Sequence, residues 1–147
     1  MTSPLRDLPR LLGSLEPVLQ PGTWAFVTLP PETDLSRVTP LATFRESEGL
    51  TAVLPLPQAE AAGWTPAFRA RWITLTVASD LEAVGLTAAF SAALAEAGLS
   101  CNVMAGVHHD HLFVPEDRGE EALACLRALQ ARAARNPAML AAPLRRP

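Results

Sequence analysis

A His-His-Asp-His run at residues 108–111 is the densest group of potential metal ligands and proton-transfer groups in the sequence. In an extended strand, His109 and His111 share one face while Asp110 points to the other. Two imidazoles on one face can hold a metal ion, but a usable site needs a third or fourth ligand. Asn102 is a poor substitute, and no second His, Cys or Glu cluster supplies one. A polar hairpin turn in which Asp110 orients an imidazole accounts for the run without a metal.

Other catalytic chemistry finds little support in the sequence. A His–Asp pair can act as a general base, but its nucleophile would have to come from elsewhere, and no motif nominates one. All twelve basic residues are arginines, which excludes Schiff-base and phosphate-loop chemistry that needs a lysine. There is no G-x-S-x-G, H-E-x-x-H, C-x-x-C or G-x-G-x-x-G motif. We therefore expect no catalytic residues, no bound metal, no cofactor and no enzymatic activity.

The composition predicts a globular chain that binds neither nucleic acid nor membranes. The 147 residues are 49% hydrophobic, and the net charge of −3 forms no block or stripe. Aromatic residues are too sparse for a base-stacking surface. No apolar run is long enough to span a bilayer, and the N-terminal segment lacks the apolar stretch of a signal peptide. Cys101 and Cys125 are too few for a disulfide framework. These features together favour a cytoplasmic location.

The second half of the chain has the clearer secondary-structure pattern. Its order of strand, helix, strand, strand and helix is ferredoxin-like and lacks only the last strand, which residues 24–29 could supply. Ser79 and Glu82 have capping-box spacing, and Gly85 fits a turn better than a helix, where it would cost about 1 kcal/mol relative to alanine. The expected elements are a strand at 72–77, a helix with its apolar face from Leu86 to Ala97, strands at 99–105 and 111–114, and a helix opening at 115–117.

The first half is less regular. Leu8, Leu11, Leu12 and Leu15 form a helical stripe. Beyond it the expected elements are a strand at 24–29, an ambiguous connection at 35–41, a hairpin of 43–46 with 50–54, and a short helix at 58–62.

One face of the second-half sheet is too apolar to be left in water. Trp72, Met104 and Phe113 lie on the side that turns away from the helices. We expect a second sheet or a second subunit to cover this face. A homodimer or larger assembly follows, unless the N-terminal half covers the face itself.

Three segments resemble a known family: Phe44–Thr51, Leu81–Thr87 and Asn102–Gly106. With the strand, acidic turn and helix that surround them, they resemble the ACT-domain signature. They are similar to a family of small free-standing bacterial proteins with two ACT-like halves, over roughly residues 8–130. One departure is visible, since the family turn more usually has an aromatic where this chain has His108.

The resemblance implies an α+β fold with a ferredoxin-like antiparallel sheet and helices on one face. Residues 5–66 would form an N-terminal ACT-like half and residues 67–135 a C-terminal ACT domain, with a flexible tail at 136–147. The two halves would share or pair their sheets.

The resemblance also implies a non-catalytic sensor or regulatory protein that binds a small molecule, an amino acid or a similar compound, between ACT units. The helix N-terminus suits a ligand carboxylate, and Gly85 permits close approach of a ligand to the backbone. Asp80 or Glu82 can bind an ammonium or a guanidinium. The implied ligand-binding residues are Ser79, Asp80, Leu81, Glu82, Ala83, Val84, Gly85, Leu86 and Asn102.

Three alternatives stay open at this stage. Ser79 and Glu82 can simply cap the helix, with Gly85 making the turn. The chain can be a structural or partner-interaction module without a ligand. It can also be a metal-dependent enzyme that uses His109, Asp110 and His111.

Overall fold

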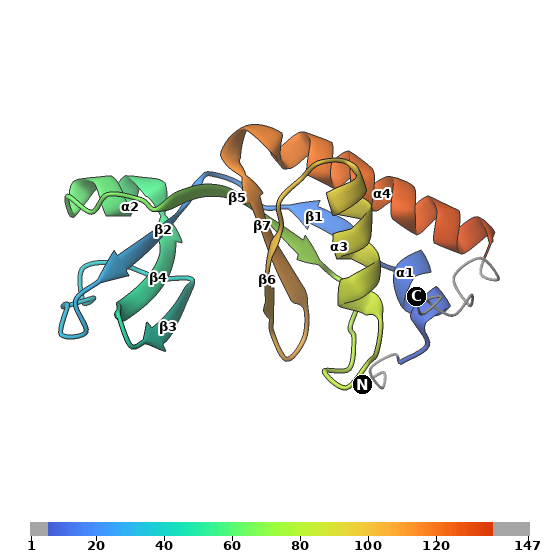
Figure 1. Cartoon of the computed structure of the whole chain (residues 1–147), viewed down its shortest axis with the longest axis horizontal. Helices are drawn as coiled ribbons and strands as arrows, with labels where there is room; N and C mark the ends of the chain where they lie inside the picture. The colour runs from blue at the N-terminus through green and yellow to red at the C-terminus, as the bar shows by residue number, and fades with distance from the viewer. Residues whose placement is uncertain (1–5, 137–147) are drawn as a thin grey trace.

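The computed structural model describes residues 6–136, which form one curled antiparallel sheet and a set of helices (Figure 1). Its strands are β1 (Pro17–Leu19), β2 (Trp24–Leu29), β3 (Ala42–Glu46), β4 (Gly49–Pro55), β5 (Phe68–Leu75), β6 (Asn102–Ala105) and β7 (Asp110–Pro115). Its helices are α1 (Leu8–Gly13), α2 (Leu56–Ala61), α3 (Leu86–Glu96) and α4 (Gly119–Arg135), with a 3-10 turn η1 (Glu116–Arg118) before α4. The expected tail lies outside the described residues, apart from Asn136.

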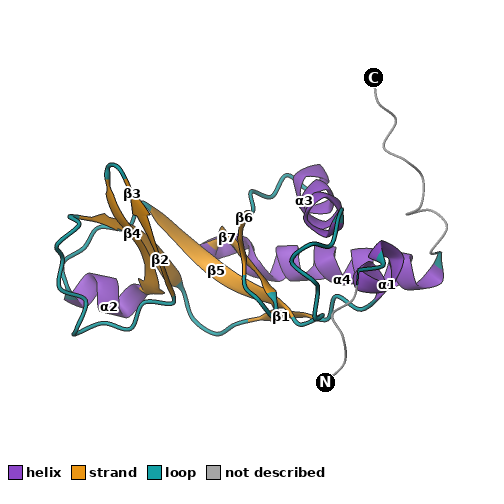
Figure 2. Cartoon of the chain, turned by 90° about the horizontal axis from the view of Figure 1, so that it is seen from below, coloured by secondary structure: helices purple, strands orange, loops and turns teal. Residues whose placement is uncertain are grey.

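The strand β5 belongs to both halves of the sheet. The strand order is β3-β4-β2-β5-β7-β6. One edge of β5 pairs with β7, whereas the other pairs with β2 beside Phe68–Ala70 and with β1 beside Ile73–Leu75. Between β1 and β2, the backbone N–H of Gln20 donates to the carbonyl of Trp72 at 2.8 Å. Figure 2 shows β5 running from one half of the molecule into the other.

The expected α+β, ferredoxin-like architecture is confirmed. In the C-terminal unit, β5, α3, β6, β7 and α4 follow in that order, and β1 lies where the last strand belongs. Residues 24–29 do form a strand against β5, but that strand is β2, the first strand of the N-terminal unit. The sequence pattern missed β1 because it is three residues long and begins with Pro17, which indicates a break in a strand.

Two strands differ in extent from the sequence prediction. The strand expected at 72–77 is β5, which begins at Phe68 and ends at Leu75. Its early part was obscured because Arg69 and Arg71 lie on the face that carries the apolar Ile73. The strand expected at 99–105 begins at residue 102, because the N–H of Leu99 still bonds to the helical carbonyl of Leu94 at 2.9 Å.

The helices pack on one face of the sheet. The larger core joins α1, α3 and α4 to β5, β6 and β7, with Leu12, Ile73, Phe90 and Leu126 fully buried. A smaller core joins α2 to β2 and β4 around Ala25. Ala25 pairs directly with Arg69, which shares its face with Ile73, so both cores lie on the same side of the sheet.

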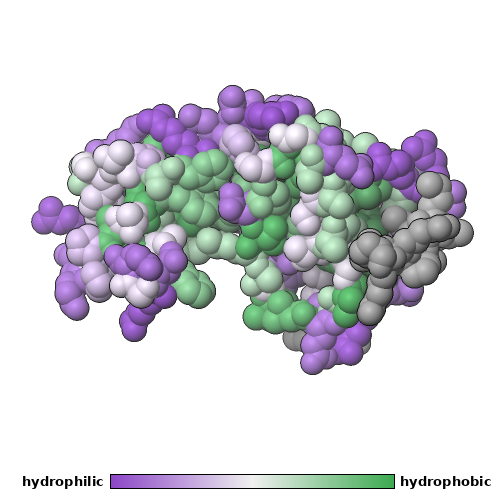
Figure 3. Space-filling view, in the orientation of Figure 1, coloured by the Kyte–Doolittle hydropathy of each residue, from purple (hydrophilic) through white to green (hydrophobic). Residues whose placement is uncertain are grey.

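The opposite face is concave and apolar. Phe26 of β2 meets the ring of Phe113 at 5.2 Å and that of Phe68 at 5.6 Å, while Trp24 meets Trp72 at 5.1 Å. These contacts leave Phe113 only 1% exposed. The curl of the sheet therefore brings the N-terminal half over part of the face that was expected to need a cover. Figure 3 shows apolar surface above the notch between the two halves.

The N-terminal unit lacks the helix that would connect its first two strands. Residues 30–41, which join β2 to β3, form turns and loop instead. The segment contains three prolines, two of them directly after β2, and proline disfavours the helical conformation in the residue before it. Within residues 6–136, the structure contains no helix long and apolar enough to cross a membrane.

Candidate functional site

The predicted ligand loop, residues 79–86, leaves the sheet at the end of β5 and leads into α3. Asp80 organises its first turn. The Asp80 carboxylate accepts from the backbone N–H of Glu82 at 2.9 Å, and the N–H of Ala83 donates to the Asp80 carbonyl at 2.9 Å. The side chain of Ser79 turns back to the sheet and donates to Asp110 at 3.3 Å. The Ser79–Glu82 pair therefore does not cap a helix, since α3 begins only at Leu86.

The acidic side chains of the loop hold the guanidinium of Arg6. Its Nε atom donates to Asp80 at 2.7 Å and a terminal nitrogen donates to Glu82 at 2.8 Å. The Asp80 pKa lies below its ordinary value, chiefly because of the Glu82 N–H and then because of Arg6. Arg6 is 62% exposed, so water competes for this pair and its strength is that of a surface salt bridge. The loop thus has the negative charge needed to hold an organic cation. In this structure, Arg6 of the chain's own N-terminal segment takes the place of that cation.

Gly85 makes the transition from loop to helix. Its φ of +99° lies in the left-handed region, which side-chain-bearing residues rarely adopt. A Cβ atom there would lie 3.0 Å from the Leu8 side chain. No side chain caps the N-terminus of α3 among the described residues, so the first N–H groups of the helix stay available to an anion.

The remaining loop residues divide between core and solvent. Leu86 is buried in the larger core, and Ala83 packs against it. Leu81 and Val84 are 62% and 84% exposed. These two aliphatic side chains are therefore open to solvent near the uncapped N-terminus of α3.

Asn102 lies apart from the loop. It is on β6, paired with Phe113 of β7, on the concave face of the sheet. It lines a cavity of about 360 Å³ with Phe26, Glu46 and Phe68, to which the loop contributes nothing. The structure brings Ser79–Leu86 together as one segment and does not add Asn102 to it.

The histidine run forms the β6–β7 turn and the start of β7. His111 accepts from the indole N–H of Trp72 at 3.1 Å through Nδ1, and the Thr74 hydroxyl lies 3.2 Å from the same atom. An accepting Nδ1 makes this imidazole neutral, with its proton on Nε2. The pKa of His111 is lowered, first by burial and then by His109. Among the described residues, no group of three or more His, Cys, Asp or Glu side chains is placed to hold a metal ion.

The two cysteines are partly buried and lie in the C-terminal unit. Burial raises the pKa of the Cys101 thiol to about 11 and also raises that of Cys125. Both are therefore protonated at neutral pH, and a protonated thiol is a poor nucleophile.

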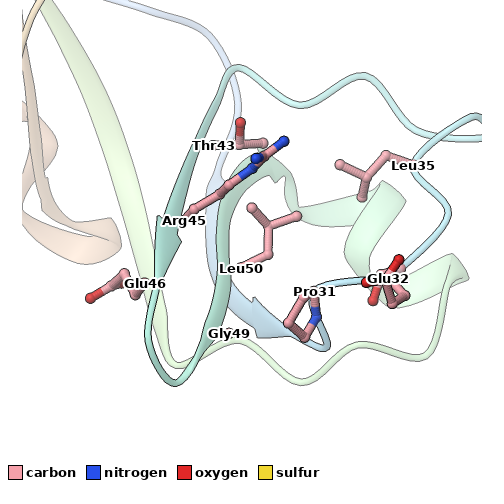
Figure 4. A pocket seen from close by; sticks show the side chains of 9 residues that line it. Pro31, Glu32, Leu35, Thr43, Arg45, Glu46, Gly49 and Leu50 are labelled. Atoms are coloured by element: carbon pink, nitrogen blue, oxygen red, sulfur yellow. The ribbon is translucent and has the colours of Figure 1, made fainter.

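A second hollow lies in the N-terminal unit, where the connecting helix is absent (Figure 4). It measures about 520 Å³ and lies between residues 31–35 and the β3–β4 hairpin. Arg45 extends over its upper side, Glu32 lies across from it, and Leu50 forms its floor. None of these residues belongs to a motif that the sequence pattern marks as a site. The available signal was a segment with no helical pattern where the ferredoxin-like order calls for a helix.

Comparison with protein families matches both halves of the chain. Residues 3–71 match one ACT-domain family and residues 67–128 match a second ACT-domain family. The two matched ranges overlap on β5, the strand that both sheet units share. Among curated proteins, none matches this chain.

Solved structures show the same architecture. A Vibrio cholerae protein of unknown function, described as a possible transport protein, is 45% identical, with a TM-score of 0.77 over 85% of this chain and 97% of that one. The ligand-free regulatory subunit of aspartate kinase from Thermus thermophilus is 10% identical, with a TM-score of 0.59 over 79% and 97%. An Agrobacterium tumefaciens protein is 14% identical, with a TM-score of 0.58 over 78% and 87%. The last two show likeness of fold alone.

Proposed function

The chain belongs to the ACT-domain family, and from that premise we propose that it is a non-catalytic sensor or regulatory protein that binds an amino acid. The observation that carries the proposal is the loop of residues 79–86. It places the acidic Asp80 and Glu82 beside the uncapped N-terminus of α3. An α-amino acid presents one ammonium and one carboxylate, which these two features complement.

Arg6 competes with any ligand for the acidic side chains of the proposed site. Its guanidinium bonds to both Asp80 and Glu82, as a ligand ammonium would. A ligand that uses the acidic pair must therefore displace Arg6. Because the side chains of Arg6 and Glu82 are largely exposed, a small ligand at millimolar concentration is able to compete.

The test is a thermal-shift screen of the twenty amino acids against the wild-type protein and the Asp80→Asn variant. A ligand raises the melting temperature in proportion to ln(1 + [L]/Kd). Asp80→Asn keeps the shape of the turn and removes the charge, so we expect a hit to lose about tenfold to a hundredfold in affinity. Asp117→Asn, an exposed aspartate on η1, is the matched control and should bind like the wild type.

Arg6→Gln gives a result of the opposite sign. Removal of the competing guanidinium should strengthen binding of the same amino acid. If no amino acid shifts the wild-type melting temperature at millimolar concentration, the sensor proposal fails.

A partner-interaction module without a small ligand is the second candidate, and the Arg6 contacts favour it. In that case Arg6 is a permanent structural tether, and neither Asp80→Asn nor Arg6→Gln changes the response to any amino acid. The exposed Leu81 and Val84 would then form part of a protein contact.

We also propose that the protein assembles as a homodimer through the exposed side of the loop. The apolar concave face is no longer sufficient reason to expect a homodimer, because the N-terminal half covers Phe113. Leu81 and Val84 now support it. Light scattering at tens of micromolar should give twice the chain mass, and a clean monomer would contradict the assembly.

A further inference from the structure

The hollow in the N-terminal unit exists because a loop replaces a helix. Leu35 and Val38 of that loop pack onto the smaller core and cover β2 and β4. On β3, Thr43 and Arg45 stay exposed on the same side of the sheet. The helix-side surface of the β3–β4 hairpin therefore faces an open space rather than a packed element.

The loop that bounds the hollow is held in place by its own hydrogen bonds. The hydroxyl and the N–H of Thr33 both donate to the carbonyl of Pro30, at 2.7 and 3.1 Å. Asp34 accepts from the N–H of Ser36 at 2.9 Å. The N–H of Thr39 donates to the side chain of Gln58 on α2 at 2.7 Å. A loop fixed in this way can present a formed pocket to a ligand, which reduces the entropy lost on binding.

Arg45 supplies an available positive charge at this place. Within residues 6–136, no carboxylate lies within ion-pair distance of its guanidinium. Glu46 also lines the hollow, but its side chain points to the opposite face of β3 (Figure 4), where its carboxylate accepts from the hydroxyl of Thr51. The planar guanidinium of arginine suits a carboxylate, which it can bind through two parallel hydrogen bonds.

The other walls narrow the choice of anion. Glu32 lies across the hollow from Arg45 (Figure 4), and its negative charge disfavours a phosphate or a dicarboxylate. The same charge favours a molecule that carries an ammonium as well as a carboxylate. Pro31, Leu35 and Leu50 add an apolar surface. A volume of about 520 Å³ falls within the range of small-molecule sites, roughly 300–1,000 Å³.

We propose that this hollow is a second ligand site, separate from the loop of residues 79–86, which takes a zwitterion with an aliphatic body. Arg45 binds its carboxylate, Glu32 its ammonium, and Leu35 with Leu50 its side chain. The ligand class rests on the proposed function, whereas the location rests on the geometry of the hollow.

The test uses calorimetric titration of the whole chain with L-valine, L-leucine and L-isoleucine. Leucinamide lacks the carboxylate and 4-methylpentanoate lacks the ammonium, so both should bind more weakly than L-leucine. Inorganic phosphate should not bind. Arg45→Gln should lower the affinity for the best amino acid about tenfold or more, because a charged hydrogen-bonding partner is lost.

Arg37→Gln is the matched control, because Arg37 is an exposed arginine of the same loop that does not line the hollow. It should bind like the wild type. Glu32→Gln should lower the affinity for L-leucine and leave the affinity for 4-methylpentanoate unchanged or higher. Both arginines are on the surface, so neither change should unfold the protein.

The outcomes separate this site from the proposed function. If Arg45→Gln binds L-leucine as the wild type does while Asp80→Asn loses it, the second site is wrong and the sensor function stands. Equal losses in Arg45→Gln and Arg37→Gln would show a general charge effect and would also overturn the site. If none of the three amino acids binds the wild type, the second site is wrong, and the screen of all twenty then decides the sensor function separately.

Discussion

His111 shows how one residue couples the polar turn to the apolar concave face. Its Nδ1 atom accepts from Trp72 and lies beside the Thr74 hydroxyl, which in turn accepts from the Gln20 amide at 3.1 Å. A proton on Nδ1 would remove the acceptor and leave the indole N–H without it. The network therefore stabilises the neutral form of the imidazole.

This dependence predicts the direction of a pH effect on stability. The pKa of His111 is lower in the folded chain than the value of about 6.5 expected for an unfolded one. The unfolded chain thus takes up the proton first as the pH falls, and its free energy drops relative to the folded state. The contribution of His111 to stability should be constant above about pH 6.5. It should fall as the pH decreases from about 6.5 through the folded pKa.

Melting curves of wild type, His111→Asn and His108→Asn between pH 8 and pH 5 would measure the effect. An asparagine at 111 can still accept from Trp72 but does not titrate, so the loss near pH 6 should shrink. His108 is exposed in the turn, and its replacement should leave the loss unchanged. If the loss of stability persisted in His111→Asn and disappeared in His108→Asn, it would come from His108, and the prediction for His111 would be wrong.

Residue types predicted local conformation well, but they did not predict which distant residues contact one another. Gly85 was expected in a turn directly before the helix, and it is the left-handed residue before Leu86. The contact between Arg6 and Asp80 spans 74 positions in the sequence. No local sequence pattern encodes a contact over such a separation. The binding of Arg6 to Asp80 and Glu82 is therefore visible only in the folded chain.

At the scale of elements, α1 belongs to the unit that lies farthest from it in the sequence. Leu11, Leu12 and Leu15 are fully buried in the same core as α3 and α4. Figure 1 shows α1 beside α4, although they come from opposite ends of the chain. Together with β1, this helix completes the C-terminal unit.

Leu12→Ala should therefore destabilise the C-terminal unit. Removal of a fully buried leucine side chain leaves a cavity and typically costs about 2–5 kcal/mol. The matched control is Leu41→Ala, because Leu41 is 38% exposed and should cost less than about 0.5 kcal/mol. Urea unfolding followed by the helical circular dichroism signal measures both. Equal effects of the two changes would show that α1 does not contribute to this core.

The success of the element predictions followed the strength of the local patterns. The strand at 24–29, the β3–β4 hairpin and α3 agree closely with expectation, because apolar periodicity and glycine turns mark them. The strand β1 was missed because a three-residue strand carries no periodicity. The hollow was missed because it results from a helix that does not form, and its residues carry no motif of their own.

At the scale of the whole molecule, the shared strand makes the two ACT units one structure. β5 pairs with β2 and β1 on one edge and with β7 on the other. The aromatic contacts of Phe26 with Phe68 and Phe113 then join the units across the concave face. Neither unit can lose β5 without opening the sheet of the other.

This arrangement predicts a single cooperative unfolding transition. Two probes can follow the units separately, since α3 and α4 lie in the C-terminal unit and Trp64 packs on the smaller core of the N-terminal unit. Trp24→Phe with Trp72→Phe leaves Trp64 as the fluorescent reporter. Its transition in urea should coincide with that of the helical circular dichroism signal, as two-state unfolding requires.

The same pair of probes can tell a shared sheet from two units that merely touch. If Trp64 reports unfolding at a lower urea concentration than the helices do, β5 can stay paired in one unit while the other is unfolded, and cooperativity fails. Val53→Ala then provides a further check, because Val53 is fully buried in the cluster that links β4 to Phe113. In a cooperative molecule this change should move both transitions to lower urea by the same amount. In two independent units, it should move the Trp64 transition alone.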